Sequence, residues 1–251
     1  HSVIFAGEKS GAAVLSGEAA LNFGSGLTTL LHSNFSNLKQ FKISPELMIS
    51  DSIPKTAKAL QIGSGLGNTE KEEIKNAINL FEDWFMKAKN PAAVIDADMF
   101  SYNELPTLIK KFNCAKNGRI VLTPHAKELS LLAKNFSLTE EKEITPEEAL
   151  GLRIQIGKIF TKKYPNAVLV MKGANTFIAE KGSIYVFAKG AQSLAKGGSG
   201  DVLAGMITSL LAQGYSAKDA AITAVWRHGT AALEYGKEAY NLTAKKLISL
   251  L

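Results

Sequence analysis

Cysteine is almost absent from this chain of 251 residues, where Cys114 is the only one. A single cysteine cannot form a disulfide within the chain, and it excludes a CxxC metal site. This usage is typical of a reducing compartment, so we expect the protein in the cytoplasm.

Long apolar runs are also missing, so no segment reaches the length of a membrane-spanning helix. The start lacks the basic region of a signal peptide, and the chain opens at His1 rather than at a methionine. We therefore expect no membrane partner. We interpret the abrupt start as a sign that the sequence is a piece of a longer protein.

Acidic residues are the scarcer charged type, with 23 Asp and Glu against 29 Lys and Arg, for a net charge of +6. The lysines are scattered and form no block of like charge, so a nucleic-acid partner is not expected. The positive excess fits either a lysine-coated surface or a groove for an anionic substrate.

Apolar segments of strand length alternate with helical segments, which is typical of a mostly parallel sheet with helices on both faces. The predicted strands lie within residues 2–7, 27–33, 45–53, 59–62, 91–95, 119–122 and 166–171, and two short ones end near residue 188. The predicted helices lie within residues 10–24, 68–90, 126–135 and 145–165, with two more after residue 198. The fold class expected is α/β, as one domain over residues 1–251.

Two details of these helices are also predicted. Asn68 or Thr69 is expected to cap the helix of residues 68–90, because acidic residues follow in its first turn. Both tryptophans, Trp84 and Trp226, are expected in the core of the protein.

A glycine-rich turn, Gly197-Gly198-Ser199-Gly200, precedes Asp201 and opens an amphipathic run. Glycines let a backbone approach a phosphate closely, and the N–H groups at a helix start attract anions. Asp201 is either a simple helix cap or a carboxylate placed beside a phosphate for chemistry. The turn is not a Walker A loop, because no Lys-Ser/Thr pair follows its last glycine.

Further polar and glycine-rich segments follow other predicted strands, at residues 63–67, 96–98, 123–128 and 172–176. The carboxyl ends of parallel strands share one edge of a sheet, so we expect these segments to meet there. Asp96 and Asp98 could bind Mg²⁺ or position a substrate, or one of them could only cap a turn.

Two basic or titratable residues in these segments have a functional and a structural interpretation. His125 is either a structural histidine or a ligand contact, and Glu128 could hydrogen-bond back to it. Lys172 is either an exposed turn lysine or a cation beside a nucleotide phosphate. Lys196 would add a second positive charge there.

The ordered set of motifs resembles the ADP/ATP-dependent NAD(P)H-hydrate dehydratases of the ribokinase-like fold. The motifs are "GAAVLSGEAALNFGSGLTTL", "IGSGLG", "VIDADMF", "VLTPHAKEL", "VMKGANTFIA" and "GGSGDVLAGMITSLLAQG". The resemblance covers nearly the whole chain and implies a three-layer α/β/α fold with a mostly parallel central sheet. It also implies a homo-oligomer, a tetramer, and a preceding NAD(P)HX epimerase domain in many members.

The implied activity is that of a hydro-lyase. It restores the S-form of hydrated NADH or NADPH (NADHX or NADPHX) by phosphorylating the ring hydroxyl with ADP or ATP and eliminating phosphate, with Mg²⁺. Asp201 falls on the position of the catalytic base. The anion hole falls on Gly197, Gly198, Ser199 and Gly200. The nucleotide-binding positions fall on Lys172, Gly173, Ala174, Asn175, Thr176 and Gly200. The hydrate-binding positions fall on Ala12, Gly67, His125 and Asp201.

This chain departs from the family pattern in two places. Ser199 stands where a threonine is commoner, and the loop before Gly11 is shorter than in many members. Alternatives stay open: a kinase of the same fold for a vitamin-precursor alcohol such as hydroxyethylthiazole, or a nucleotide-binding protein without catalysis. A hydride-transferring dehydrogenase is disfavoured, because the first strand is not followed by GxGxxG.

Overall fold

The computed structural model describes residues 1–34, 36–236 and 239–251. Within them, nine strands form one sheet in the order β3-β2-β1-β4-β5-β6-β7-β8-β9. β1 to β7 pair in parallel, and β8 and β9 continue the sheet as antiparallel strands. The strands are β1 Ser2–Phe5, β2 Thr28–Leu31, β3 Leu47–Ser50, β4 Ala59–Ile62, β5 Ala92–Ile95, β6 Arg119–Leu122, β7 Ala167–Met171, β8 Thr176–Glu180 and β9 Ser183–Phe187. The predicted mostly parallel α/β fold is confirmed.

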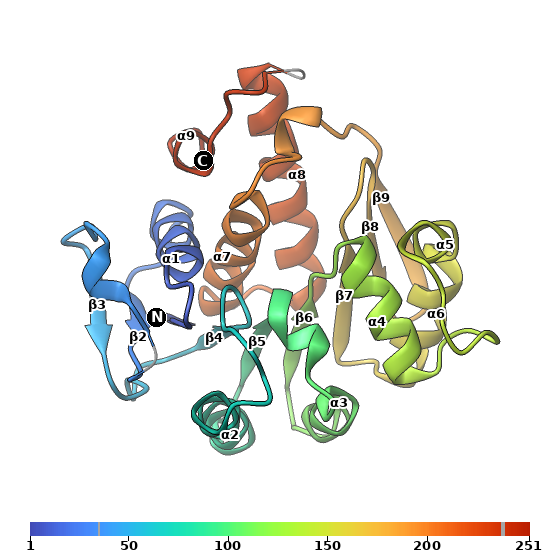
Figure 1. Cartoon of the computed structure of the whole chain (residues 1–251), viewed down its shortest axis with the longest axis horizontal. Helices are drawn as coiled ribbons and strands as arrows, with labels where there is room; N and C mark the ends of the chain where they lie inside the picture. The colour runs from blue at the N-terminus through green and yellow to red at the C-terminus, as the bar shows by residue number, and fades with distance from the viewer. Residues whose placement is uncertain (35, 237–238) are drawn as a thin grey trace.

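Helices cover both faces of the sheet and make three layers (Figure 1). One face packs on α1 (Gly11–Asn22), α7 (Ser199–Ala212), α8 (Ala217–Tyr235) and α9 (Ala244–Ile248). The other packs on α2 (Glu72–Lys87), α3 (Leu105–Asn113), α4 (Ala126–Phe136), α5 (Pro146–Gly151) and α6 (Arg153–Lys163). Three short 3₁₀ turns are also present among the described residues: η1 (Leu38–Gln40), η2 (Ala97–Ser101) and η3 (Gln192–Leu194).

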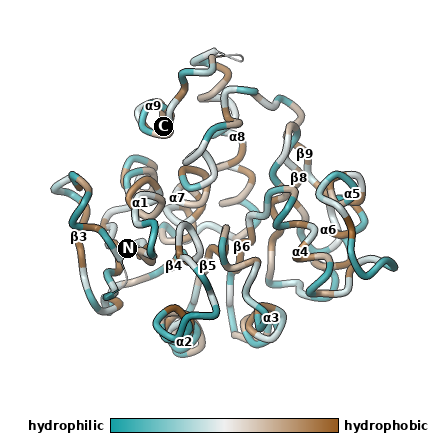
Figure 2. Tube along the Cα trace, viewed as in Figure 1, coloured by the Kyte–Doolittle hydropathy of each residue, from teal (hydrophilic) through white to brown (hydrophobic). Residues whose placement is uncertain are grey.

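The central strands are apolar along their whole length because helices bury both of their faces. Their alternate residues enter different cores: Leu60 and Ile62 of β4 pack toward α2, whereas Ala59 packs toward α7. Figure 2 shows the corresponding contrast in the helices, where the trace of α2 alternates between brown and teal. None of the helices in the described part of the chain combines the length and the apolar character that crossing a bilayer requires.

α1 and α7 lie in unusually close contact. A Cβ built on Gly205 of α7 would lie 2.1 Å from the carbonyl oxygen of Ser16 of α1, so only glycine allows this approach. The two backbones therefore touch one another near the middle of α7.

Two predicted helix boundaries are wrong. The helix expected over residues 145–165 is two helices, because Leu152 has φ −91° and ψ 8° and ends α5 where α6 begins. The helix expected from residue 68 starts at Glu72, with Lys71 rather than Asn68 or Thr69 at its N-cap. Asn68 instead accepts a hydrogen bond from the Glu70 N–H and forms a turn ahead of the helix.

Two further expectations need correction. Trp226 is not in the core, since it is 57% exposed, whereas Trp84 is partly buried. The inward face of α8 consists mainly of small side chains such as Ala220, Ala221 and Ala224, and Trp226 lies outside it. Three helices, not two, follow residue 198 in the described chain, because α9 ends it.

Candidate active site

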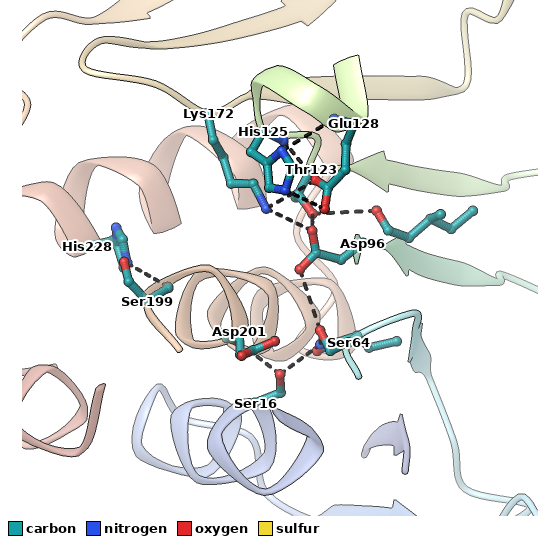
Figure 3. Close-up of polar contacts among 12 residues, drawn as sticks. Ser16, Ser64, Asp96, Thr123, His125, Glu128, Lys172, Ser199, Asp201 and His228 are labelled. Atoms are coloured by element: carbon teal, nitrogen blue, oxygen red, sulfur yellow. Dashed lines mark hydrogen bonds and ion pairs between the residues drawn. The ribbon is translucent and has the colours of Figure 1, made fainter. Parts of the chain in front are cut away.

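The segments predicted to meet do meet at the carboxyl edge of the sheet. The loop after β4, Asp96 after β5, Thr123 after β6 and Lys172 after β7 come together there with the start of α7. Figure 3 shows this cluster, in which Lys172, Asp96 and Thr123 lie on one side and Asp201, Ser64 and Ser16 on the other.

α7 starts at the glycine-rich turn without a side-chain cap from any described residue. Its N-cap is Gly198, whose φ of +90° favours glycine. A Cβ on Gly198 would also lie 2.8 Å from the side chain of Leu15. The start of α7 is therefore open to an anion, as the glycine-rich pattern predicted.

Asp201 is the third residue of α7, so the interpretation of Asp201 as a plain helix cap is wrong. Burial and the nearby charge of Asp96 raise the pKa of its carboxyl to about 6, whereas the Ser64 hydroxyl and Lys172 limit the rise. The Ser16 hydroxyl donates to its main-chain carbonyl at 2.9 Å. A carboxyl with this pKa is ionised near neutral pH and still basic enough to accept a proton.

Lys172 is not an exposed turn lysine, because only 19% of its side chain is accessible. Its ammonium donates to Asp96 Oδ1 at 2.9 Å and lies 3.9 Å from Glu128 Oε2. Burial alone would lower the pKa of Lys172, but the charges of Asp96 and Glu128 raise it. Lys172 is therefore a fixed cation at the start of α7, where a Cβ on Gly200 would lie 3.4 Å from its Nζ.

Asp96 and Asp98 have different partners. Asp96 is buried and accepts from the Thr123 hydroxyl at 2.7 Å as well as from Lys172. Asp98 accepts from the N–H of Gly67 at 2.9 Å and so holds the glycine loop after β4. Neither carboxylate acts as a simple cap of the following turn, because η2 has Asp96 at its N-cap without a side-chain cap bond.

The glycine loop after β4 brings together two of the predicted hydrate-binding positions. Gly63, Gly65 and Gly67 all have positive φ angles, which other residues rarely adopt. A Cβ on Gly65 would lie 3.1 Å from the Cβ of Ala12, so this loop packs on the first turn of α1. Ala12 and Gly67 therefore flank the same loop.

His125 is the N-cap of α4 and forms a reciprocal pair with Glu128. The Glu128 N–H donates to His125 Nδ1 at 3.3 Å, and the His125 N–H donates to Glu128 Oε2 at 2.8 Å. His125 Nε2 lies 3.0 Å from Glu128 Oε1, which favours the tautomer with a proton on Nε2. The predicted bond from Glu128 back to His125 is confirmed.

A cavity of about 610 Å³ lies between β7, α7 and α8 and has the size of a small-molecule site. Apolar and aromatic side chains such as Phe187, Leu203 and Val225 line it. The sequence-predicted residues in its lining are His125, Lys172, Gly173, Ala174, Thr176, Ser199 and Gly200. Among the described residues, the structure does not place Ala12, Gly67, Asn175, Gly197, Gly198 or Asp201 in that lining. The predicted residues thus divide into a cavity group and a glycine-loop group, with Asp201 near both.

Lys196 does not add a second positive charge beside Lys172. Its ammonium donates to the main-chain carbonyl of Tyr240 at 2.6 Å. Lys172 is therefore the lysine that lines the cavity in the described part of the chain.

The sequence analysis missed two buried polar residues near the site. His228 of α8 lines the cavity, and its Nε2 lies 3.0 Å from the Ser199 carbonyl oxygen. Burial lowers the pKa of His228 to about 4, so its ring is neutral and donates to that carbonyl. Gln61 of β4 is fully buried and lies behind Ser16 and Ser64. Gln61 lies in an otherwise apolar strand, and His228 lies on the inward face of α8. The spacing of residues in the sequence therefore did not identify either of them as a site residue.

The described residues include no group of three or more His, Cys, Asp or Glu side chains suited to a metal ion. The Asp96 carboxylate is already engaged by Thr123 and Lys172. A divalent cation at this site would therefore depend mainly on oxygens that the protein does not supply, such as nucleotide phosphates and water.

The relatives of this chain among known proteins share one family description. Residues 2–251 match the sequence model described as NAD(P)H-hydrate dehydratase. The chain is 38% identical over 251 residues to the bifunctional NAD(P)H-hydrate repair enzyme of Helicobacter pylori, covering 99% of this chain and 48% of that protein. It is 33% identical to the ADP-dependent (S)-NAD(P)H-hydrate dehydratase of Neisseria meningitidis, covering 89% of this chain and 72% of that one. The chain thus spans about half the length of its Helicobacter relative.

Solved structures agree with the sequence relatives. The ADP/ATP-dependent NAD(P)H-hydrate dehydratase of Bacillus subtilis, co-crystallised with ATP and Mg²⁺, superposes with a TM-score of 0.78 at 25% identity, over 99% of this chain and 86% of that one. A hydroxyethylthiazole kinase from Pyrococcus horikoshii has a TM-score of 0.64 at 15% identity, over 99% of this chain and 86% of that one, which shows a shared fold alone. This protein therefore belongs to the NAD(P)H-hydrate dehydratase family.

Proposed function

We propose that the protein dehydrates the S-form of NADHX or NADPHX to NADH or NADPH with ADP or ATP as phosphoryl donor. One observation carries the proposal: the partly buried Asp201 carboxyl, with a pKa raised to about 6, stands at the open start of α7 beside Lys172. The relatives named as dehydratases support the choice of substrate.

The nucleotide occupies the cavity between β7, α7 and α8 in this proposal. The backbone of residues 173–176 and the apolar lining hold the nucleoside part. The phosphates point toward Gly200 and Lys172, because the open helix start and the ammonium both favour negative charge. Gly197, Gly198, Ser199 and Gly200 form the anion hole. Mg²⁺ would be held mainly by phosphate oxygens and water, because Asp96 is already engaged by Thr123 and Lys172, and it would neutralise part of the phosphate charge.

The hydrate lies next to Asp201 and against the glycine loop, with Ala12 and Gly67 as its contacts there. Its third contact is His125, which also lines the nucleotide cavity. Asp201 accepts the proton of the ring hydroxyl as that oxygen attacks the terminal phosphorus of the nucleotide. The bond between this phosphorus and the leaving AMP or ADP breaks at the same time. The phosphate ester then loses phosphate from one ring carbon and a proton from its neighbour, and the double bond returns.

The decisive assay mixes the protein with NADHX, Mg²⁺ and either ADP or ATP and follows the absorbance of reduced nicotinamide. A rise that requires nucleotide supports the dehydratase and identifies the donor. No rise together with binding of the hydrate indicates an inactive site. No rise and no binding favours the vitamin-precursor kinase, which would leave a stable phosphorylated product with hydroxyethylthiazole.

We also propose a cytoplasmic homotetramer, on the single cysteine and on the resemblance. Some relatives are bifunctional enzymes about twice the length of this chain, so an NAD(P)HX epimerase domain, fused or separate, is the proposed partner. Light scattering coupled to gel filtration measures the assembly, and a monomer would contradict this part of the proposal.

A further inference from the structure

Gln61 is the polar exception in a central strand. It lies on β4 between β1 and β5, it is fully buried, and its neighbours Ala59, Leu60 and Ile62 are apolar. A buried amide without hydrogen-bond partners is strongly unfavourable, because it loses its bonds to water and gains none in return. The hydrogen-bond partners of its amide therefore decide whether Gln61 is tolerated at this position.

The amide of Gln61 is fully engaged by three buried hydroxyls from three different elements. Its Nε2 donates to Ser16 Oγ of α1 at 2.8 Å and to Ser64 Oγ of the glycine loop at 3.0 Å. Its Oε1 lies 3.1 Å from Thr208 Oγ1 of α7 and shares the one proton of that hydroxyl with the Ala204 carbonyl oxygen, which lies 2.8 Å from it. Both amide protons and the amide oxygen are therefore used.

These bonds determine where the serine protons go. A hydroxyl has one proton, so a serine oxygen that accepts from Gln61 directs its own proton to another group. Ser16 donates to the carbonyl of Asp201 at 2.9 Å. Ser64 Oγ lies 3.5 Å from Asp96 Oδ2, which is long for a hydroxyl bond, and the Ser64 hydroxyl also lowers the pKa of the Asp201 carboxyl.

We propose that Gln61 is a positioning residue for the reaction: its amide orients the Ser16 and Ser64 hydroxyls so that Ser16 holds the backbone of Asp201 and Ser64 turns its proton toward the neighbouring carboxylates of Asp96 and Asp201. This inference rests on the proposed function for the role of Asp201. Gln61 acts only through the two serines and does not touch the reacting atoms.

The charged groups around Asp201 come from other elements and are not altered by changes at Gln61. Asp96 follows β5 and Asp98 lies on η2, and both disfavour the ionised form of Asp201. Lys172 follows β7 and favours the ionised form. The Ser64 hydroxyl also favours it, so removing this hydroxyl raises the pKa of Asp201 and shifts activity to higher pH.

The test compares kcat/KM for the hydrate against pH, at saturating nucleotide and Mg²⁺, in wild type and in Ser64→Ala, Gln61→Leu and Thr208→Val. Phosphate ionisation of the nucleotide is common to all four proteins, so only differences between them count. Ser64→Ala is expected to move the acidic limb up by about one pH unit, which lowers the relative rate at pH 6 about fivefold. Gln61→Leu moves it in the same direction by a smaller amount.

Thr208→Val is the matched control. It breaks the bond to the amide oxygen of Gln61 but leaves both amide protons on the serines, so the acidic limb stays where it is in wild type. An unchanged limb in Gln61→Leu, with only a lower melting temperature, overturns the proposal, because Gln61 is then structural. An equal shift in Thr208→Val also overturns it, because packing of α7 then explains the effect.

A second readout does not depend on turnover. ¹³C NMR of aspartate-labelled protein gives the titration midpoint of Asp201, assigned as the signal that Asp201→Asn removes. Midpoints that rise in Ser64→Ala and Gln61→Leu support the positioning role even if wild type shows no dehydratase activity, and unchanged midpoints overturn it. Should Gln61→Leu not fold, Gln61→Met fills the same volume with a more flexible side chain and is judged by the same criteria.

Discussion

Two helix starts at the same edge of the sheet are built in opposite ways. α4 is closed by its own side chains, because His125 and Glu128 bond reciprocally to one another's N–H groups. α7 begins at Gly198 with no cap from the described side chains, and it keeps a partly buried carboxylate in its first turn. One start satisfies its amides internally, whereas the other leaves them for a ligand. A helix start can therefore serve either stability or binding.

Among substitutions at the start of α7, Asp201→Asn is expected to have the largest effect on turnover. The amide cannot accept the proton of the substrate hydroxyl, so turnover is expected to fall by about 10³-fold, while ADP binding is retained. The absorbance of reduced nicotinamide measures turnover, and isothermal titration calorimetry measures ADP binding. Retained turnover would contradict the assignment of Asp201 as the base.

The same substitution should stabilise the protein at neutral pH. Folding raises the pKa of Asp201 from 3.8 to about 6, so the folded protein binds this proton more tightly than the unfolded chain does. Stability is therefore lost as the pH rises between these values, by up to about 3 kcal/mol. Denaturant melts should show Asp201→Asn and wild type alike at pH 4 and the variant more stable at pH 7.5.

Lys172→Met removes the cation that faces the α7 start. The buried Asp96 carboxylate then loses its ion-pair partner, so the free energy of unfolding should fall by about 3 kcal/mol, with turnover down about 100-fold. The double variant Lys172→Met, Asp96→Asn should recover stability but not turnover. Denaturant melts and the absorbance assay separate the two effects, and recovery of both would assign Lys172 a purely structural role.

A methyl group can test how closely a ligand approaches the α7 start. Gly200→Ala would place its Cβ 3.4 Å from Lys172 Nζ, in the lining of the cavity, so the KM for nucleotide should rise about tenfold. Gly197→Ala is the comparison within the same anion hole: nothing lies within 4 Å of its Cβ and its backbone N–H is kept, so the KM should rise less than in Gly200→Ala. Equal effects of the two substitutions would indicate loop stiffness rather than contact with the nucleotide.

Substitutions at the closed start of α4 should change the stability of the protein more than its binding of the nucleotide. His125→Ala removes the cap and should cost about 1 kcal/mol, whereas His125→Asn keeps a good capping side chain and should cost little. If His125 also contacts the hydrate, His125→Asn will still raise the KM for NADHX. Thermal melts together with steady-state kinetics distinguish these two roles.

Much of this arrangement was predictable, because strand ends and glycine turns are local features of the sequence. The apolar run ending in Ile95 predicted a central strand, and the edge it shares with its neighbours predicted the position of Asp96. The role of Gln61 was not predictable, because its partners Ser16 and Thr208 lie 45 and 147 residues away. The burial of Lys172 likewise depends on Asp96, 76 residues earlier.

Gly205 limits how α1 and α7 can move relative to one another. Because α1 and α7 touch backbone to backbone beside Ser16, neither helix can slide or tilt without separating main chains in direct contact. Asp201 therefore moves with the rigid body of the two helices, and any opening and closing that admits ligands must occur in the surrounding loops. The amides in the middle of α7 should then exchange with deuterium only through global unfolding, at a rate that ligand binding slows only as far as it stabilises the whole fold.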